Sequence, residues 1–258
     1  MTKKKVLWKM FKKGCLPDPH DSRDIPLSSF LDNSKPYPTL IDYRGYTHTP
    51  SDQMKIGTCV AFGCVRGVKE TLDYMHGEWS MLSPLWLYDQ CKRIDGFPYM
   101  DGTTIRAAMK ILAQKGCAPE ALLPYDDGYY FGKYDKEIER IFWSDTRPFR
   151  IKTYARLHNI EEMNRCLAQH GPFAIGTLVT DSYEKVDSSG VIGLGYTSIM
   201  GGHCVAIVGT DVKEERFILM NSWGTNWGDR GFGYMPWDYW SVFGLDAWGV
   251  VDVHPNRA

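Results

Sequence analysis

The 258-residue sequence contains no C-x-x-C pair and no run of about 18 apolar residues. The first absence argues against a zinc ribbon, and the second argues against a membrane-spanning helix. The apolar run Val6-Leu7-Trp8 is too short for the core of a secretory signal. Internal repeats and low-complexity tracts are also missing, which excludes repeat and disordered proteins. From these absences we expect a chain that is neither exported nor inserted into a membrane.

The composition is that of a globular protein. Hydrophobic residues make up 43% and charged residues 24%, both close to average soluble usage. At this length, one large domain or two lobes with a shared core can form without any disulfide. Aromatic residues are abundant at 14%, which indicates large side chains in a core or beside a cleft.

The first 13 residues contain six lysines and no acidic residue. The remaining chain, residues 14–258, holds 24 basic and 31 acidic residues, a net charge of −7. The basic charge therefore belongs to a tail and not to a face of the fold. Such a tail, with Trp8 and Phe11, could contact an anionic membrane or nucleic acid, but we expect a solvated, mobile terminus and predict no nucleic-acid partner.

The seven cysteines are an odd number and are scattered along the chain. This pattern predicts neither a closed disulfide framework nor a metal site, and we expect most of the cysteines to be buried thiols.

Two changes in composition and residue pattern divide the chain. Residues 15–40 contain five prolines and little periodicity, which predicts an extended arm, so we place an N-terminal arm with its basic tail at 1–40 and one domain at 41–258. Within that domain, apolar spacing and capping signals predict helices at residues 58–76, 83–93, 104–115 and 159–170. Runs rich in β-forming residues follow at 173–179, 203–210, 216–221, 232–235 and 247–253. Because the predicted helices come before the predicted strands along the chain, we expect an α+β fold. Its helical lobe is predicted at about 41–150 and its strand lobe at about 151–258.

Cys59 lies where a glycine-containing loop turns into the first predicted helix. The free N–H groups and the dipole of a helix N-terminus favour thiolate over thiol, so the pKa of Cys59 is expected below the value of about 8.5 for free cysteine. A nucleophile of this kind needs a proton donor for the leaving group, and His203, at the start of an apolar strand, is a candidate. Eighteen residues later, the Asn221 amide could accept the imidazole N–H, while Trp223 would shield that bond from water.

Each of these residues alone has an ordinary structural explanation: a core thiol, a hydrogen-bonded histidine, a turn. Together they read Gln-x5-Cys at a helix start, a histidine 144 residues after the cysteine, and then Asn-Ser-Trp-Gly. This order resembles the papain and cathepsin family of cysteine peptidases. The resemblance extends from Ile41 to near Val253, about four fifths of the chain.

The resemblance implies a two-lobed papain-like fold, with a helical lobe, an antiparallel β-sheet or barrel, and the active-site cleft between them. It makes Cys59 the nucleophile, His203 its acid–base partner, Asn221 the residue that orients His203, and Gln53 an oxyanion-hole donor. The implied activity is a thiol endopeptidase that cleaves polypeptide substrates through a thioester and needs no metal or organic cofactor. Gly176 and Gly202 would lie near the main specificity pocket, with Gly102 and Trp223 as further substrate-binding positions.

The sequence also departs from the family pattern. Val60 stands where tryptophan is usual, Ile56 stands where a disulfide cysteine is usual, Cys91 lacks its expected partner, and only about forty residues replace the long propeptide. We therefore expect a cytoplasmic, reduced protein without native disulfides. We also expect a monomer. Two other functions stay open at this point: an amide-transfer or deamidating enzyme with the same geometry, and a catalytically silent binding homologue.

Overall fold

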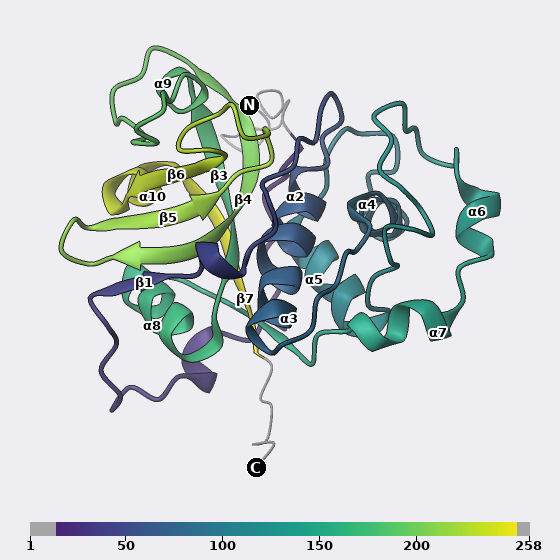
Figure 1. Cartoon of the computed structure of the whole chain (residues 1–258), viewed down its shortest axis with the longest axis horizontal. Helices are drawn as coiled ribbons and strands as arrows, with labels where there is room; N and C mark the ends of the chain where they lie inside the picture. Colours follow the sequence, from purple (N-terminus) through teal and green to yellow (C-terminus); the bar gives the residue numbers. More distant parts are fainter. Residues whose placement is uncertain (1–13, 252–258) are drawn as a thin grey trace.

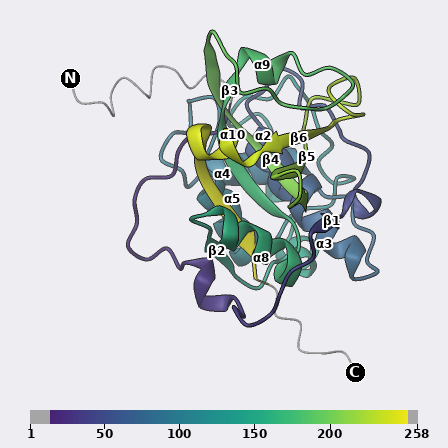
Figure 2. The ribbon, with the colours of Figure 1, turned by 90° about the vertical axis from the view of Figure 1, so that its left-hand side faces the viewer.

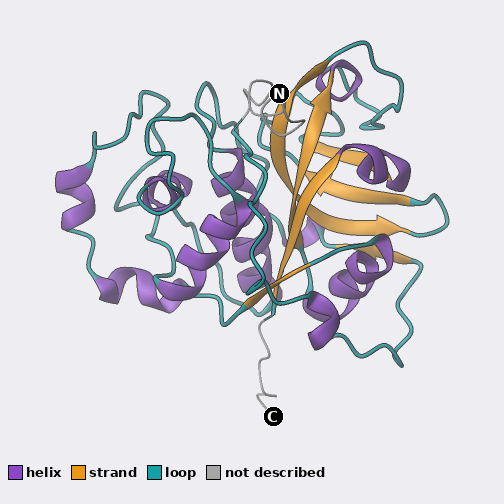
Figure 3. Ribbon diagram, turned by 180° about the vertical axis from the view of Figure 1, so that it is seen from behind, coloured by secondary structure: helices purple, strands orange, loops and turns teal. Residues whose placement is uncertain are grey.

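The computed structural model describes residues 14–251 and has two lobes that pack against each other (Figure 1). The predicted basic tail lies outside the described residues. One lobe contains the helices of the first half of the chain, and the other is built on a sheet (Figure 3). The α+β, two-lobed prediction is therefore confirmed. None of the helices in this described range is long and apolar enough to cross a membrane.

The described strands form a seven-stranded sheet with the order β2-β7-β3-β4-β5-β6, and β1 pairs with β4. All of these pairings are antiparallel. The strands are β1 (Leu40–Asp42), β2 (Tyr154–Arg156), β3 (Phe173–Thr180), β4 (Ile199–Asp211), β5 (Arg216–Met220), β6 (Phe232–Pro236) and β7 (Gly244–Val250). The five predicted strands correspond to β3 to β7. β1 and β2 were not predicted, and β1 belongs to the sheet although it lies at the junction between the predicted arm and the predicted helical lobe.

The central helix runs from Cys59 to Met75 in three parts: α2 (Cys59–Phe62), the π-helical η3 (Gly63–Lys69) and α3 (Glu70–Met75). It packs directly on β4, the strand that carries His203 (Figure 1). A Cβ atom at Gly67 would overlap the Cβ of Ala206, so only glycine allows this close approach. The predicted helix at 58–76 is confirmed, but its π-helical middle was not foreseen.

Side-chain caps fix three other predicted helices within one residue. Ser83 and Thr104 accept backbone N–H groups at the starts of α4 (Pro84–Lys92) and α5 (Ile105–Gln114). Asn159 accepts the N–H of Glu162 at the start of α8 (Ile160–His170), while Glu162 accepts the N–H of His158 and not that of Asn159. The remaining elements are short: η1 (Leu27–Phe30), η2 (Arg44–Tyr46), α6 (Asp135–Glu139), α7 (Trp143–Thr146), η4 (Arg147–Phe149), α9 (Asp181–Glu184) and α10 (Trp237–Phe243).

The sheet has helices on both faces. In Figure 2, α8 and α10 lie in front of the strands, and the helical lobe lies behind them. One apolar core fills the contact between the central helix and β4, and a second lies under α8 and α10. All seven cysteines are buried, as predicted.

The N-terminal arm is largely extended, but it does more than lie on the surface. Its side chains Cys15, Leu16 and Leu27 are almost completely buried. The arm therefore contributes to both apolar cores, which the proline content of this segment did not indicate.

A buried ion-pair cluster lies against the central helix. Arg66 contacts Glu70 at 2.7 Å and Glu120 at 2.9 Å, and Glu70 also accepts the backbone N–H of Leu82. Burial raises the pKa of Glu70 to about 7; Glu120 acts in the same direction and Arg66 opposes it.

This raised pKa predicts a pH-dependent stability. Between the ordinary value of 4.5 and about 7, the folded chain keeps a proton on Glu70 that the unfolded chain releases. The free energy of unfolding should therefore fall as pH rises through this window, by at most about 1.4 kcal/mol per pH unit for this one proton. Glu70→Gln should remove that part of the slope, measured by urea unfolding at several pH values. Identical slopes in the two proteins would contradict the assignment.

Candidate active site

Cys59 is the first residue of α2 and follows Thr58 at the N-cap position. Its side chain has no exposed surface, and α2 packs against β4, the strand that carries His203. Burial raises the pKa of the Cys59 thiol well above its ordinary value, and the nearby Cys15 adds to the rise. The prediction of a lowered pKa is therefore wrong for this structure, because loss of hydration disfavours the thiolate more than the helix terminus favours it.

His203 lies on β4, and its ring Nε2 is 2.7 Å from Oδ1 of Asn221. The backbone N–H of Ser222 also meets Asn221 Oδ1, at 2.8 Å, and an N–H can only donate. The amide oxygen is thereby fixed in its orientation, so Nε2 of His203 must carry a proton and Nδ1 is the nitrogen left for acid–base exchange. The Trp223 ring stacks on the imidazole, with centroids 4.6 Å apart and an angle of 28°. This places Trp223 beside the His203–Asn221 bond, where the sequence analysis expected it.

Gln53 is held next to this pair by both its backbone and its side chain. Its backbone N–H donates to the Ser222 carbonyl at 2.8 Å, and its Oε1 accepts the Ser222 hydroxyl at 2.6 Å. Its Nε2 donates to the Ile56 carbonyl at 2.9 Å. A primary amide has two N–H groups, so this bond uses one of the two donors.

Two residues that position Gln53 were not assigned a role from the sequence. Ser222 was visible only as the second residue of the Asn-Ser-Trp-Gly motif. Tyr125 donates its hydroxyl to the Gln53 carbonyl and also contacts the Thr58 hydroxyl at 2.8 Å, which ties the segment before the helix to its N-cap. Its signal in the sequence was no more than the Pro-Tyr pair at 124–125.

The predicted substrate-binding glycines come together around residues 14–16 of the N-terminal arm, which we call the arm tip. Thr103, next to Gly102, donates its N–H to the Gly14 carbonyl and accepts the N–H of Leu16, both at 2.9 Å. Across the lobe interface, the Gly202 carbonyl accepts the N–H of Cys15 at 3.1 Å. The Cys15 sulfur lies over Gly176, 2.9 Å from where a Cβ would stand. The sequence analysis did not predict that the arm reaches these positions.

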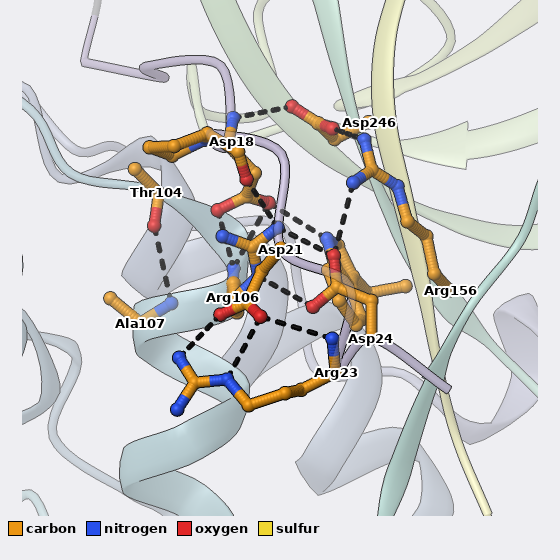
Figure 4. A network of polar contacts seen from close by, with 11 residues as sticks. Asp18, Asp21, Arg23, Asp24, Thr104, Arg106, Ala107, Arg156 and Asp246 are labelled. Atoms are coloured by element: carbon orange, nitrogen blue, oxygen red, sulfur yellow. Dashed lines mark hydrogen bonds and ion pairs between the residues drawn. The ribbon is translucent and has the colours of Figure 1, made fainter. Parts of the chain in front are cut away.

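A network of charged residues holds the following part of the arm to both lobes (Figure 4). Asp24 accepts two hydrogen bonds from Arg106 of α5, at 2.6 and 2.8 Å, and one from Arg156 of β2 at 3.2 Å. Asp18 accepts the Trp248 indole N–H at 2.8 Å, and its own backbone N–H donates to Asp246 at 2.8 Å. Arg156 also pairs with Asp246.

A separate cavity lies apart from these residues. A cavity of about 810 Å³ is lined by residues that include Arg44, His48, Pro50 and Phe232, and neither Cys59 nor His203 lines it. Within residues 14–251, no group of three or more His, Cys, Asp or Glu side chains is arranged to hold a metal ion.

Comparison with known protein families decides the classification. The model of the family described as papain family cysteine protease matches residues 37–243. The chain belongs to this family. It is therefore a hydrolase of the cysteine-peptidase class, as the sequence resemblance implied.

Individual relatives of the papain family agree with this result. Xylellain, a cysteine protease from Xylella fastidiosa, is 27% identical and superimposes with a TM-score of 0.82, over 95% of this chain and 97% of xylellain. A peptidase C1-like protein of Acanthamoeba polyphaga mimivirus is 26% identical, over 90% of this chain and 81% of the viral protein. Cathepsin B-like cysteine proteinase 6 of Caenorhabditis elegans is 25% identical over 70% of this chain, which spans only 56% of that protein.

Two residues near Cys59, Val60 and Ile56, depart from the papain-family pattern. Val60 is completely buried in the helical lobe. Ile56 contacts Gln53 through its backbone carbonyl, so this contact does not depend on the identity of the Ile56 side chain. Neither replacement removes a polar group from the contacts of Gln53, His203 and Asn221.

Proposed function

We propose that the chain hydrolyses peptide bonds with Cys59 as nucleophile and His203 as its acid–base partner. The observation that carries this proposal is the fixed orientation of the His203 imidazole. Asn221 holds Nε2 as the protonated nitrogen, and Trp223 covers that bond, so Nδ1 is the site of proton exchange. Cys59 is the first residue of α2, which packs against the strand that carries His203, and this packing supports action of the two as one unit.

The reaction proceeds in two halves. The Cys59 thiol transfers its proton to His203 and attacks the peptide carbonyl, and His203 then returns a proton to the leaving amine. Water, deprotonated by His203, hydrolyses the thioester and regenerates the thiol. In each half, negative charge develops on the carbonyl oxygen, and the Gln53 amide and the Cys59 backbone N–H are the donors that we assign to it.

We infer that an extended polypeptide substrate pairs with the backbone at Gly102 and Thr103. The arm tip supports this inference, because Thr103 pairs with its backbone through both its N–H and its carbonyl. Gly176 and Gly202 have no side chains of their own in the adjacent space, which the Cys15 sulfur occupies over Gly176, and Trp223 stacks on the His203 ring. We propose that the enzyme acts as an endopeptidase.

A labelling experiment tests the reaction type. The reduced full chain is incubated with an unfolded protein substrate in ¹⁸O-labelled water that contains a primary amine. We expect new carboxyl termini that carry the heavy oxygen. Amine at the new ends would show an amide-transfer enzyme, and products that differ only by deamidated side chains would show a deamidase.

Asn221→Ala should lower hydrolysis less than loss of Cys59 or His203, because His203 keeps its proton-accepting nitrogen and loses only its fixed tautomer and ring position. The loss should appear mainly in kcat, measured by steady-state peptide hydrolysis. Asn221→Asp is the matched variant, since it keeps an acceptor at the same place. Loss of all activity in Asn221→Ala, with the fold retained, would contradict a role limited to orientation.

We also propose a reducing, cytoplasmic setting and a monomeric enzyme. The support is the chemistry of the thiols: Cys91 is buried without the partner that the family pattern would supply, and a nucleophilic thiol is preserved where thiols stay reduced. Cell fractionation tests the location, and light scattering of the purified chain tests the oligomeric state.

A further inference from the structure

The tip of the N-terminal arm is bound between the two lobes through its backbone. It pairs with Thr103 on the helical side and Gly202 on the sheet side, the two positions next to the proposed substrate path. Gly14 has φ of +74° and packs against Gly57 so closely that a Cβ atom there would overlap the Gly57 backbone. Cys59 and His203 are at most 1% exposed in this arrangement. A substrate can therefore reach them only when the tip moves.

The side chain at the tip is a thiol, and it lies beside a second thiol. Gly176 on β3 is the direct antiparallel partner of Cys204 on β4, so the positions face the same side of the sheet. The Cys15 sulfur covers Gly176 on that side, 2.9 Å from where a Cβ would stand, and this places it next to the Cys204 side chain across the strand pair. The tip thus brings a thiol of the N-terminal arm next to a thiol on the strand that holds His203.

The rest of the arm would keep the tip near this place after it lifts. Asp18 and Asp24 remain bonded to Arg106, Arg156, Asp246 and Trp248, only a few residues along the chain (Figure 4). A group that is tethered over such a short distance returns to its binding position at high effective concentration.

We propose that Cys15 and Cys204 form a redox-sensitive pair whose disulfide fastens the arm tip over Cys59. This inference rests on the proposed function, because the consequence of closure is loss of hydrolysis. In the reduced chain the tip can open, and substrate can take its place. In the oxidised chain the tip stays bound and Cys59 stays covered.

The chemistry requires a two-electron oxidant, for which a small-molecule disulfide such as oxidised glutathione is sufficient. When the tip lifts, the Cys15 thiolate attacks oxidised glutathione, forms a mixed disulfide and releases one glutathione. When the tip returns, the Cys204 thiolate displaces the second glutathione, and the Cys15–Cys204 bond forms. Two protein thiols thereby lose two electrons and two protons, and one oxidised glutathione becomes two reduced molecules.

Cys64 is another thiol near Cys204, whose sulfur lies 3.0 Å from where a Cβ of Gly63 would stand, but Cys64 belongs to η3 in the packed core. Cys15 differs because its segment can expose it to the oxidant without unfolding the domain. This difference favours Cys15 as the partner that reacts first.

The first test does not depend on activity. The full-length Cys59→Ser chain is incubated with oxidised glutathione, digested without reduction and mapped by mass spectrometry. We expect one peptide pair joined through Cys15 and Cys204. A Cys64–Cys204 link, or the absence of any link while glutathione is attached to Cys15, would overturn the proposal.

The second test uses wild type, Cys15→Ser and Cys64→Ser, each assayed before and after oxidation. Oxidised wild type should lose hydrolysis, contain the Cys15–Cys204 link with Cys59 free of glutathione, and recover in dithiothreitol. Cys64→Ser should behave like wild type. Cys15→Ser should be active when reduced, and on oxidation it should carry glutathione on Cys59, because its tip no longer stays closed. A Cys15–Cys59 link in wild type would contradict the assignment of partners. Correct linkage without any hydrolysis in the reduced proteins would instead count against the proposed function.

Discussion

Cys59→Ala and His203→Ala should each reduce peptide hydrolysis by roughly 10⁴-fold or more, leaving only the residual catalysis that the oxyanion donors and substrate binding supply. The reason is that the nucleophile and its proton acceptor act as one unit, so either loss removes the covalent route. The double variant should consequently be no slower than the slower single variant. Steady-state assays on a fluorogenic peptide in excess reductant measure all three.

The fold must survive these changes for the comparison to be valid. Cys59→Ser is the matched control for the thiol, since it keeps the size and a hydroxyl at the same place. Thermal unfolding and circular dichroism should match wild type, because the His203–Trp223 stack and the central helix do not need the sulfur. Hydrolysis by Cys59→Ala at the wild-type rate would remove the basis of the peptidase proposal.

Gln53→Ala should lower turnover by roughly 10² to 10³ while the affinity for an uncleaved peptide changes little. The Gln53 amide is assigned to the oxyanion, a charge that is present only as the transition state forms. Single-turnover kinetics and equilibrium binding to Cys59→Ala and to the Cys59→Ala, Gln53→Ala double variant separate the two effects.

Ser222→Ala is the matched control, because it removes the hydroxyl that fixes Gln53 Oε1 and leaves the amide donor in place. Its effect on turnover should be the smaller of the two. If Gln53→Ala weakened ground-state binding and turnover equally, Gln53 would be a structural residue that braces Ile56 and Ser222.

The elements that could be predicted from the sequence are those with local signals. The caps at Ser83, Thr104 and Asn159 mark α4, α5 and α8 because each cap bonds to a backbone group three residues away. Strands β1 and β2 have three residues each, and they form only because they pair with distant residues on β4 and β7. A local pattern cannot show such pairings, and for this reason both strands were missed.

The same distinction applies to the candidate site. Motif order was enough to name Gln53, Cys59, His203 and Asn221, and the structure brings their segments together. It was not enough for the pKa of Cys59, which burial by the rest of the chain raises and the nearby Cys15 thiol raises further. The position of the arm tip could not be predicted from the sequence either. Its contacts between Gly14, Leu16 and Thr103 use backbone N–H and carbonyl groups, which all residues except proline carry in the same form.

The most direct test of the central claim is to identify the cysteine on which activity depends. The reduced full-length chain is treated with an epoxide-type inhibitor of thiol proteases while hydrolysis is followed, and the protein is then mapped by mass spectrometry. Of the seven cysteines, Cys59 alone should carry the inhibitor, in proportion to the activity lost, and His203→Ala should be labelled far more slowly. Complete inhibition with Cys59 unmodified would contradict the account.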